Sequence, residues 1–518
     1  MATETSGKPV STDHSTGIEA QSGLDPWKKA ELPAPPNTAG IKILGVIGPG
    51  AIILGASIGS GEWLLGPAAF VKYGLTLLWV TGVAIVLQTI FNTEVMRYAL
   101  YTGEPVITGF MRTRPSSTFW AWFYAVLSFF QVGWPAWAGS AAGAIFFLFA
   151  GRMAEASDSN TVYLISVATF LVCVAILVFS GKRIERTLEI LNWTLIVCIL
   201  GTLIVLCVLY GSSSKWLGAA AGFFAFDLES KSFSLFPAGA DWFLIGAFAA
   251  YSGMGGVGNL MLSNYARDKG YGMGKVVGFI PAAVGGQQVK LAHTGSVFDI
   301  NQESLSKWRG WWRIISIDQW SVFFIGAILG MGLPAILYTS AIQPGKEIRG
   351  LAVAAELAYA MSARGGAALT IILAIMSVWV LFKTQLDLIE GMARSVTDIL
   401  WSGNERIRNW RGGDVRVVYY TVLTVVVIWG LLALRITQPI ILLQLGANMA
   451  GLVFVFSAIH LVYLNTKFLP QALRPPMWRR AALIFMSVFY GFFVYLWLMG
   501  GIVPDKEKGF LFTFTKYW

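Results

Sequence analysis

The chain has 518 residues, of which 56% are hydrophobic and 13% are charged, and its formal net charge is +10. Globular domains carry about twice this share of charged residues, so the composition excludes a string of soluble domains. The positive charge could suggest a nucleic-acid binder, but the Lys and Arg residues are scattered through short gaps between long apolar blocks. No nucleophile constellation, phosphate loop or zinc spacing appears, and we expect neither enzyme activity nor a cofactor.

The chain begins with a polar stretch at 1–40 that is rich in Ser, Thr, Gly and Pro. Such a composition cannot bury enough apolar surface to fold alone, and it predicts a disordered cytoplasmic tail without a cleavable signal.

Eleven apolar segments of membrane-spanning length follow, and they predict an all-α polytopic membrane protein. Basic clusters recur in every second gap between them, so the positive-inside rule places these gaps and the amino terminus in the cytoplasm and the carboxyl terminus outside. We expect an integral protein of a bacterial cytoplasmic membrane. The predicted spans are 41–70, 75–98, 119–149, 161–180, 188–210, 242–262, 316–338, 367–390, 417–434, 440–464 and 481–499.

The longest connection, a cytoplasmic loop at 266–313, ends in the aromatic and basic run 307–313. Trp with Lys or Arg favours the headgroup zone of a bilayer, so this run could be an interfacial segment. A solvated loop with one amphipathic turn fits equally well.

Two of the eleven spans, the first and the sixth, are interrupted by glycine at 55–62 and at 253–259. The two interruptions share a pattern, with Gly-Ser-Gly-Glu at 59–62 and Gly-Val-Gly-Asn at 256–259. An offset of five spans also reverses orientation in the membrane. This pattern predicts a five-plus-five inverted repeat, with helices 1–5 in 41–210, helices 6–10 in 211–464, and helix 11 with a short outer tail in 465–518.

Glycine-rich interruptions free backbone groups that lipid cannot satisfy, so such stretches line a protein interior or a watery cavity. Paired interruptions in two inverted halves are typical of a transporter site near the midplane. The alternative is close helix packing, for which glycine spaced along a span is also common. Two interruptions in register, each followed by one strongly polar side chain, favour the site.

At these residues the chain resembles the Nramp family of divalent-metal transporters, which have a five-plus-five inverted-repeat fold. The resemblance rests on Gly-Pro-Gly at 48–50, the first interruption, Trp63, and the run from Tyr73 to Val80, with weaker similarity in the seventh and tenth spans. It implies a transporter fold with helices 1 and 6 broken.

The chain departs from the metal-binding motifs of that family. The family's Asp-Pro-Gly-Asn stands here as Gly-Ser-Gly-Glu at 59–62, so the aspartate is lost and a carboxylate replaces the asparagine. The family's Met-Pro-His stands as Gly-Val-Gly at 256–258, which removes the thioether and the imidazole. Without that histidine, we expect proton coupling to be weak or absent.

The groups that remain form an all-oxygen set, made of Glu62, Asn259 and the backbone carbonyls near Ile58 and Gly255. Such a set suits Mg²⁺, Ca²⁺ or Mn²⁺ better than softer metals. We predict Glu62 and Asn259 as metal ligands, and one carboxylate leaves a bound ion several of its waters. An acid in the first turn of a half-helix also simply favours the helix dipole. The predicted substrate-binding positions at the two interruptions are Ile58, Gly59, Glu62, Gly255, Gly256 and Asn259.

Two other functions stay open. Small glycines, together with Trp63, Trp134 and Trp137, could instead form a cavity for a small organic solute such as an amino acid. A transporter-derived receptor that signals through 266–313 ranks lower, because nothing in that loop resembles a signalling module. No oligomeric state can be predicted.

Further polar residues inside spans are candidates for coupling or gating. On the eighth span, Lys383, Asp387 and Glu390 share a helical face. They form either an internal ion pair with Lys383 snorkelling toward solvent, or a site in which Lys383 stands where related folds bind a coupling sodium ion. The second span holds Glu94 and Arg97, a structural pair or part of an inner gate. The tenth holds Gln444 and Asn448, near where the family has a polar residue beside its ion.

Overall fold

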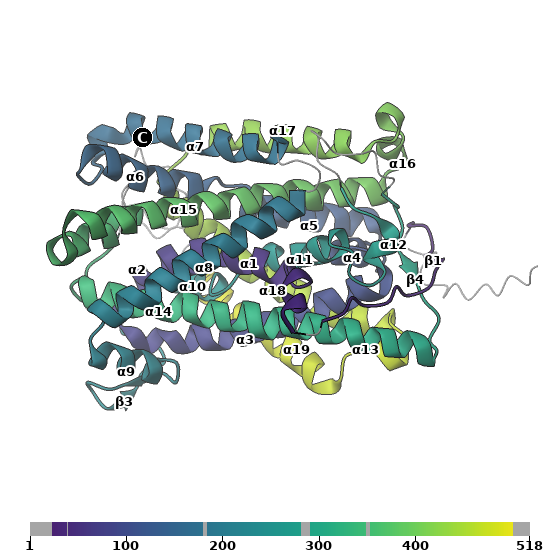
Figure 1. The fold of residues 1–518 in the computed structure, drawn as a ribbon, viewed down its shortest axis with the longest axis horizontal. Coiled ribbons are helices and arrows are strands. Elements are labelled where there is room, and N and C mark those ends of the chain that lie inside the picture. The colour runs from purple at the N-terminus through teal and green to yellow at the C-terminus, as the bar shows by residue number, and fades with distance from the viewer. Residues whose placement is uncertain (1–22, 39, 180–183, 281–290, 349–352, 501–518) are drawn as a thin grey trace, which may run out of the picture.

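A computed structural model describes residues 23–38, 40–179, 184–280, 291–348 and 353–500. The long helices run side by side between two ends of the molecule, which lie at the left and right of Figure 1. In the described residues, the strands form two small ladders: β1 with β4 in parallel and β2 with β3 antiparallel. The predicted all-α class is confirmed.

The α-helices are α1 (Pro49–Ser57), α2 (Gly66–Tyr73), α3 (Leu78–Thr102), α4 (Val106–Met111), α5 (Ser117–Val132), α6 (Ala136–Ala150), α7 (Ser159–Phe179), α8 (Ile184–Tyr210), α9 (Ser213–Gly222), α10 (Trp242–Ala250), α11 (Val257–Asp268), α12 (Gly274–Val277), α13 (Gln302–Ile317), α14 (Ile325–Ala341), α15 (Glu356–Gly403), α16 (Glu405–Arg408), α17 (Val415–Ala433), α18 (Pro439–Lys467) and α19 (Met477–Gly500). Two π-helices, η3 (Ile58–Leu65) and η6 (Asp318–Phe324), continue them. The shorter elements are η2 (Gly40–Gly45), η4 (Leu75–Leu77), η5 (Ala156–Asp158), η7 (Val353–Ala355), η8 (Trp410–Gly412), η9 (Gln471–Leu473), β1 (Lys28–Lys29), β2 (Phe226–Asp227), β3 (Ser232–Phe233) and β4 (Ser296–Val297).

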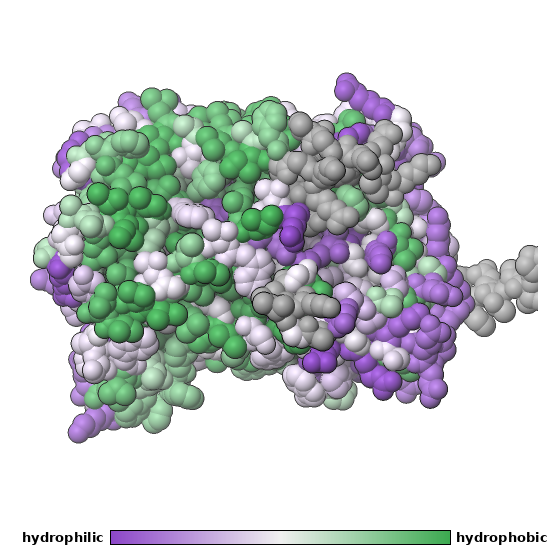
Figure 2. Space-filling model, viewed as in Figure 1, coloured by the Kyte–Doolittle hydropathy of each residue, from purple (hydrophilic) through white to green (hydrophobic). Residues whose placement is uncertain are grey.

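Nine of the helical stretches in the described residues are long and apolar enough to cross a membrane. They match the second to fifth and the seventh to eleventh predicted spans. The first and sixth spans, which were predicted to be interrupted, are not among the nine. Large apolar side chains on the outer faces are exposed, such as Val197, Val208 and Val425 at 63–68%. A surface of this kind, green in Figure 2, fits lipid rather than water, and the chain is an integral membrane protein.

Local sequence explains where several helices begin and end. The side chain of Ser116 accepts a hydrogen bond at the start of α5, and that of Asp241 does so at the start of α10. Gly103 and Gly151 end α3 and α6 with a φ of 69° each. This left-handed conformation costs glycine little, so it closes a helix sharply.

The third predicted span is itself interrupted, which was not predicted. Helix α5 ends at Val132 and α6 begins at Ala136, with Gly133, Trp134 and Pro135 between them. Proline has no N–H to donate to the preceding turn, and this accounts for the interruption.

Two ends of different polarity fit the predicted topology. The segments in or next to the gaps with basic clusters, α4, α12, α13 and α16, lie together at the right of Figure 1, whereas α9 and β3 lie at the left. The right-hand end is largely hydrophilic in Figure 2. The assignment of this end to the cytoplasm stays a prediction, as does the division into two repeats. The outer tail at 501–518 and residues 1–22 lie outside the described residues.

The prediction of a disordered tail at 1–40 is wrong for residues 23–38, here called the N-terminal strap. Strand β1 pairs with β4, and Trp311 donates a hydrogen bond to the carbonyl of Pro33 at 2.8 Å. Trp27 packs against the rings of Tyr98, Tyr101 and Phe468. These contacts come from elements far along the chain, so the composition of the tail alone could not reveal them.

The aromatic and basic run 307–313 belongs to the helix α13 rather than to a solvated loop. Trp308 and Trp311 are buried at 6% and 3% exposure. The guanidinium of Arg97 lies 4.1 Å from the ring centre of Trp312, close enough for a cation–π contact. The tryptophans therefore pack on the protein, and an interfacial position of α13 stays a prediction.

Candidate functional site

The start of the first span is anchored by a carboxylate from the seventh. Asp318 is buried, and its oxygens accept hydrogen bonds from the backbone N–H groups of Gly48 at 2.9 Å and Gly50 at 2.7 Å. A negative group at a helix start satisfies amides that have no partner within the helix. A Cβ atom on Gly50 would lie 2.6 Å from the backbone oxygen of Asp318, which explains the glycine.

The first span is not broken, contrary to prediction. Helix α1, the π-helix η3 and α2 follow one another without a gap from Pro49 to Tyr73, and are here called helix 1. A π-helix keeps hydrogen bonds along the chain, five residues apart, so the carbonyls near Ile58 and Gly59 are not laid bare. The carbonyl of Ala56 accepts hydroxyl hydrogens from Ser60 at 3.2 Å and Thr384 at 3.0 Å.

The predicted break in the sixth span is confirmed. Helix α10 ends at Ala250 and α11 begins at Val257, and together they are here called helix 6. Between them Gly253, Gly255 and Gly256 have φ values of 110°, 86° and 47°. Residues that carry a side chain rarely adopt these φ values, so the glycines permit the break.

Helix 1 and the break of helix 6 are in direct backbone contact. A Cβ atom on Gly61 would lie 1.7 Å from the carbonyl oxygen of Tyr251. The widened turn of η3 therefore packs against the first residue after α10, which only a glycine at 61 allows. Although helix 1 is continuous, the two predicted stretches do meet.

Glu62 lies beside this contact and is fully buried. In the described part of the chain, neither carboxylate oxygen has a hydrogen-bond partner. A buried carboxylate without a partner is costly, which indicates that it binds something else.

Asn259, in the first turn of α11, is the second predicted metal ligand. It is fully buried, and its Nδ2 donates to Oδ1 of Asn92 at 2.8 Å. Its own Oδ1 has no hydrogen-bond partner among the described residues. Asn92 thus turns the Asn259 amide so that its oxygen, the atom a hard cation would bind, stays open.

The Gly255 carbonyl, expected to be a free oxygen ligand, is already occupied. It accepts hydrogen bonds from the backbone N–H of Gly258 at 3.0 Å and from Nε2 of Gln131 at 2.9 Å. A carbonyl oxygen has two lone pairs, so both are used. Gly256 serves packing, since a Cβ there would meet Oε1 of Gln131 at 2.4 Å.

Sequence reasoning missed Gln88, Asn92 and Gln131, which surround the break. Gln88 and Asn92 lie on α3, one helical turn apart, and Gln131 lies at the end of α5. A usable signal was present, because isolated amide side chains inside apolar spans are costly unless they have a structural or functional partner.

The tenth-span candidates do not join the break. Asn448 on α18 donates to the carbonyl of Phe243 at 2.9 Å and to that of Gln444 at 2.9 Å. Phe243 precedes the break by about two helical turns. Asn448 therefore fastens α18 to α10, while Gln444 is half-buried on the same helix.

The eighth-span candidates divide into two separate groups. Lys383 pairs with Asp387, which also accepts from Asn192 at 3.2 Å, and both are buried. The predicted internal ion pair is thus present, but Lys383 does not reach toward solvent. Glu390 instead pairs with Arg394, one turn further along α15.

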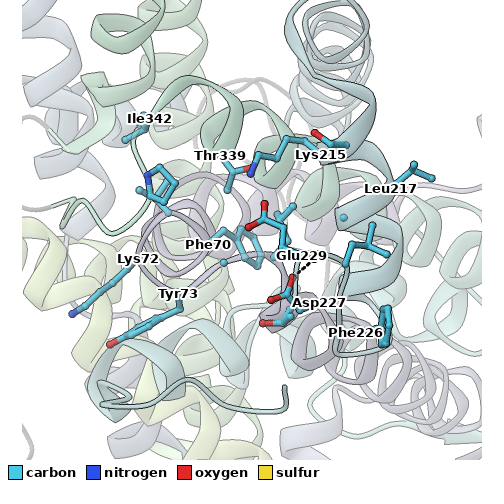
Figure 3. Close-up of a pocket in the computed structure, with 18 residues that line it drawn as sticks. Phe70, Lys72, Tyr73, Lys215, Leu217, Phe226, Asp227, Glu229, Thr339 and Ile342 are labelled. Carbon is cyan, nitrogen blue, oxygen red and sulfur yellow. Dashed lines mark hydrogen bonds between the residues drawn. The ribbon is translucent and has the colours of Figure 1, made fainter. Parts of the chain in front are cut away.

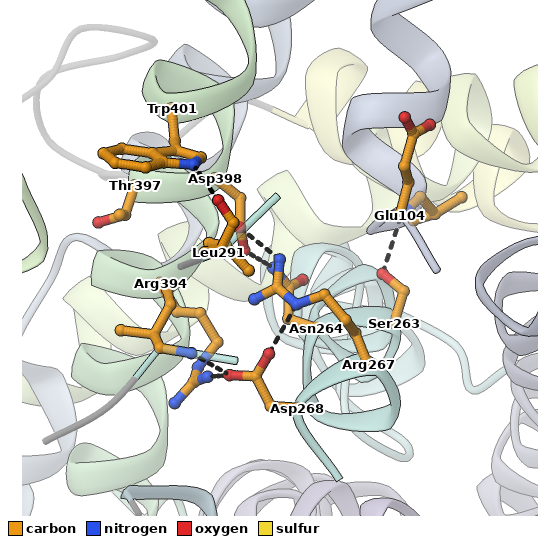
Figure 4. Close-up of polar contacts among 12 residues, drawn as sticks. Glu104, Ser263, Asn264, Arg267, Asp268, Leu291, Arg394, Thr397, Asp398 and Trp401 are labelled. Atoms are coloured by element: carbon orange, nitrogen blue, oxygen red, sulfur yellow. Dashed lines mark hydrogen bonds and ion pairs between the residues drawn. The ribbon is translucent and has the colours of Figure 1, made fainter. Parts of the chain in front are cut away.

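Arg394 connects this group to helix 6 through a buried network of charges (Figure 4). It pairs with both Glu390 and Asp268 at the end of α11. Arg267 pairs with Asp268 at 2.6 Å and, at 2.5 Å, with an aspartate on α15, Asp398. Because acids and bases alternate, each charge faces its opposite, and α11 is tied to α15.

Glu94 and Arg97 form the predicted pair, at 2.7 Å. Arg479 also pairs with Glu94 at 3.0 Å, and Asn465 donates to the Glu94 carbonyl at 2.9 Å. This cluster joins α3 to α18 and α19, where it holds helix ends together.

The three tryptophans proposed to line a solute cavity do not lie together. Trp63 and Trp137 are buried, and Trp137 donates to Oγ of Ser60 at 3.3 Å. Trp134 instead packs on Trp429 of α17.

A pocket of about 590 Å³ lies at the end of α2 (Figure 3). Lys72, Lys215, Asp227 and Glu229 line it together with the ends of α9 and α14. None of the predicted substrate-binding residues reaches it, so it is separate from Glu62. In the described residues, no group of three His, Cys, Asp or Glu side chains could hold a metal ion.

Solved structures with the same fold were found by comparison. Two crystal structures of variants of the Eremococcus coleocola manganese transporter match at TM-scores of 0.64 and 0.65, with 14% identity and 93% of both chains covered. A complex of that transporter with an aromatic bis-isothiourea substituted compound matches at 0.62, with 16% identity over 92% of both chains. The chain has the fold of a membrane transporter. No family model and no curated protein matches the sequence.

Proposed function

We propose that the protein carries a hard divalent cation, Mg²⁺ or Mn²⁺, across a bacterial cytoplasmic membrane, and that Glu62 and Asn259 bind it. One observation carries the proposal: the Glu62 carboxylate, next to the contact of helix 1 with the break, and the Asn259 amide oxygen, in the first turn of α11, are both buried without a hydrogen-bond partner in the described residues. Oxygen ligands suit these cations. The transporter fold supports transport rather than catalysis.

The burial of Glu62 also supports alternating access. Its side chain is closed to solvent from both ends in this conformation. A cation can therefore reach it only after one end opens, and leave only after the other does. With one carboxylate, the ion keeps several of its waters. The two histidines that the structure describes contact other segments, His293 at Asp25 and His460 at Tyr124, so we expect neither to couple transport to protons.

A small organic solute such as an amino acid is the second candidate. The indole of Trp63, which belongs to helix 1, and that of Trp137, which donates to Ser60 of helix 1, support it. The half-helix start of α11 would hold its carboxylate, and Glu62 its ammonium.

Uptake assays in proteoliposomes distinguish a carrier of divalent cations from a carrier of small organic solutes. We expect saturable uptake of Mg²⁺ or Mn²⁺ that an imposed pH gradient does not accelerate, and no uptake of alanine or glycine. Empty liposomes are the control. Uptake of an amino acid without uptake of either cation would instead show that the protein carries an organic solute. Faster cation uptake from an acidic external buffer would show proton coupling.

A further inference from the structure

Two glutamine side chains occupy the two sides of the break in helix 6. On the α10 side, Nε2 of Gln88 donates to the Ser252 carbonyl at 2.9 Å, and its Oε1 accepts from the N–H of Gly255 at 3.3 Å. On the α11 side, Gln131 donates to the Gly255 carbonyl at 2.9 Å and accepts from Val257 N–H at 2.8 Å. Each amide therefore donates and accepts at once.

Each glutamine side chain lies against a glycine that leaves no room for a Cβ atom. A Cβ atom on Gly253 would lie 2.6 Å from Oε1 of Gln88, and one on Gly256 would lie 2.4 Å from Oε1 of Gln131. Both glycines also have a positive φ. The two glycines therefore let the backbone approach the glutamine amides closely, and a larger residue at either position would prevent this contact.

The two amides decide which backbone oxygens stay open. Ser252 and Gly255 have their carbonyls occupied by Gln88 and Gln131. Within the described ranges, no hydrogen bond reaches the carbonyl oxygens of Gly253 or Met254. The Tyr251 carbonyl accepts no hydrogen bond in these ranges either, but it lies against Gly61, where a Cβ atom would be 1.7 Å away. Buried carbonyls are nearly always paired, so those of Gly253 and Met254 are the oxygens of the break left open to a cation.

We propose that Gln88 and Gln131 are positioning residues of the cation site, which hold the break so that the carbonyls of Gly253 and Met254, rather than that of Gly255, join Glu62 as ligands. The proposal rests on the function proposed above. It replaces the backbone ligand expected from the sequence with two others.

The chemistry of the amide supplies a test through pH. A carboxyl group in place of the Gln131 amide can donate to Gly255 and accept from Val257 only while it is protonated. Once ionised, it can only accept, and it faces the Gly255 carbonyl with a negative charge. Position 131 is buried, and burial disfavours the ionised carboxylate, so the group stays protonated at a pH where an exposed glutamate is already ionised. The variant Gln131→Glu should therefore work at low pH and fail at high pH, whereas Gln131→Met should fail at both.

Two measurements on the purified full chain test this. For Mn²⁺ uptake, KM of Gln131→Glu should match the wild type at pH 5.5 and exceed it about tenfold at pH 8, the loss expected for one buried hydrogen bond. Without any cation, its Tm should fall by about 3 °C or more relative to wild type over the same range. A merely structural glutamine would change Tm and leave KM alone.

The possible results distinguish a failure of the positioning role from a failure of the proposed function. Equal KM for wild type and Gln131→Glu at both pH values would overturn the positioning role. If the wild type takes up no Mn²⁺, the proposed function fails, and the Tm comparison still tests whether Gln131 holds the break. If the Tm difference between wild type and Gln131→Glu is the same at pH 5.5 and at pH 8, Gln131 does not hold the break either.

Discussion

Replacing Gly61 by alanine should abolish transport and lower the stability of the protein. The new methyl carbon would lie 1.7 Å from the carbonyl oxygen of Tyr251, far inside contact distance, and that oxygen belongs to backbone rather than to a flexible side chain. Helix 1 must move away from the break, which separates Glu62 from helix 6. Overpacking of this kind costs about 1–3 kcal/mol. Thermal unfolding and Mn²⁺ uptake of the same preparation measure both effects.

Gly201→Ala is the matched control, because Gly201 also lies in a spanning helix, α8, and a Cβ atom there would meet nothing within 4 Å. That variant should transport as the wild type does and be at least as stable, since alanine favours helix over glycine. Normal transport by Gly61→Ala would show that the contact between helix 1 and helix 6 is unimportant.

Arg394→Met should give the largest loss of stability. Methionine fills a similar volume but removes the cation that Asp268 and Glu390 share in a fully buried site. Breaking a buried ion pair by removing one partner costs about 3–5 kcal/mol, because the remaining charge stays uncompensated. The Tm of purified protein should fall by several degrees, and α11 should loosen from α15.

The control for this variant is Arg364→Met, on the same helix but exposed to its surroundings. A surface substitution of this type usually changes stability by less than about 0.5 kcal/mol. If both variants melt at the wild-type temperature, the network does not fasten helix 6, and its charges must be paired differently.

The fold class and most spans could be predicted from the sequence because the length of an apolar run is set by the thickness of the bilayer. The break at 253–256 was also predictable, since three nearby glycines support φ values that other residues avoid. At 59–61 the same reasoning gave the wrong structure. Two glycines and a serine are equally compatible with a π-helix, and the choice depends on Tyr251 and Thr384, which come from other helices.

The N-terminal strap and the glutamines at the break escaped prediction for a related reason. The strap is polar and becomes ordered only because β4 and α13 offer it partners. Gln88 and Gln131 are single polar residues in long apolar runs, and nothing local shows that their partners lie on helix 6. Glu62 and Asn259 were found because they follow the glycines directly. In each case, contacts between segments far apart in sequence decided the outcome.

Manganese binding to the purified protein tests the central claim most directly. Electron paramagnetic resonance of free Mn²⁺ should reveal a saturable site in the wild type that is lost in Glu62→Gln, since this change keeps the shape of the side chain and removes its charge. The exposed carboxylate of Glu303, 2.7 Å from Lys307, supplies the control, and Glu303→Gln should bind as the wild type does. Undiminished binding by Glu62→Gln would contradict a cation site between helix 1 and helix 6.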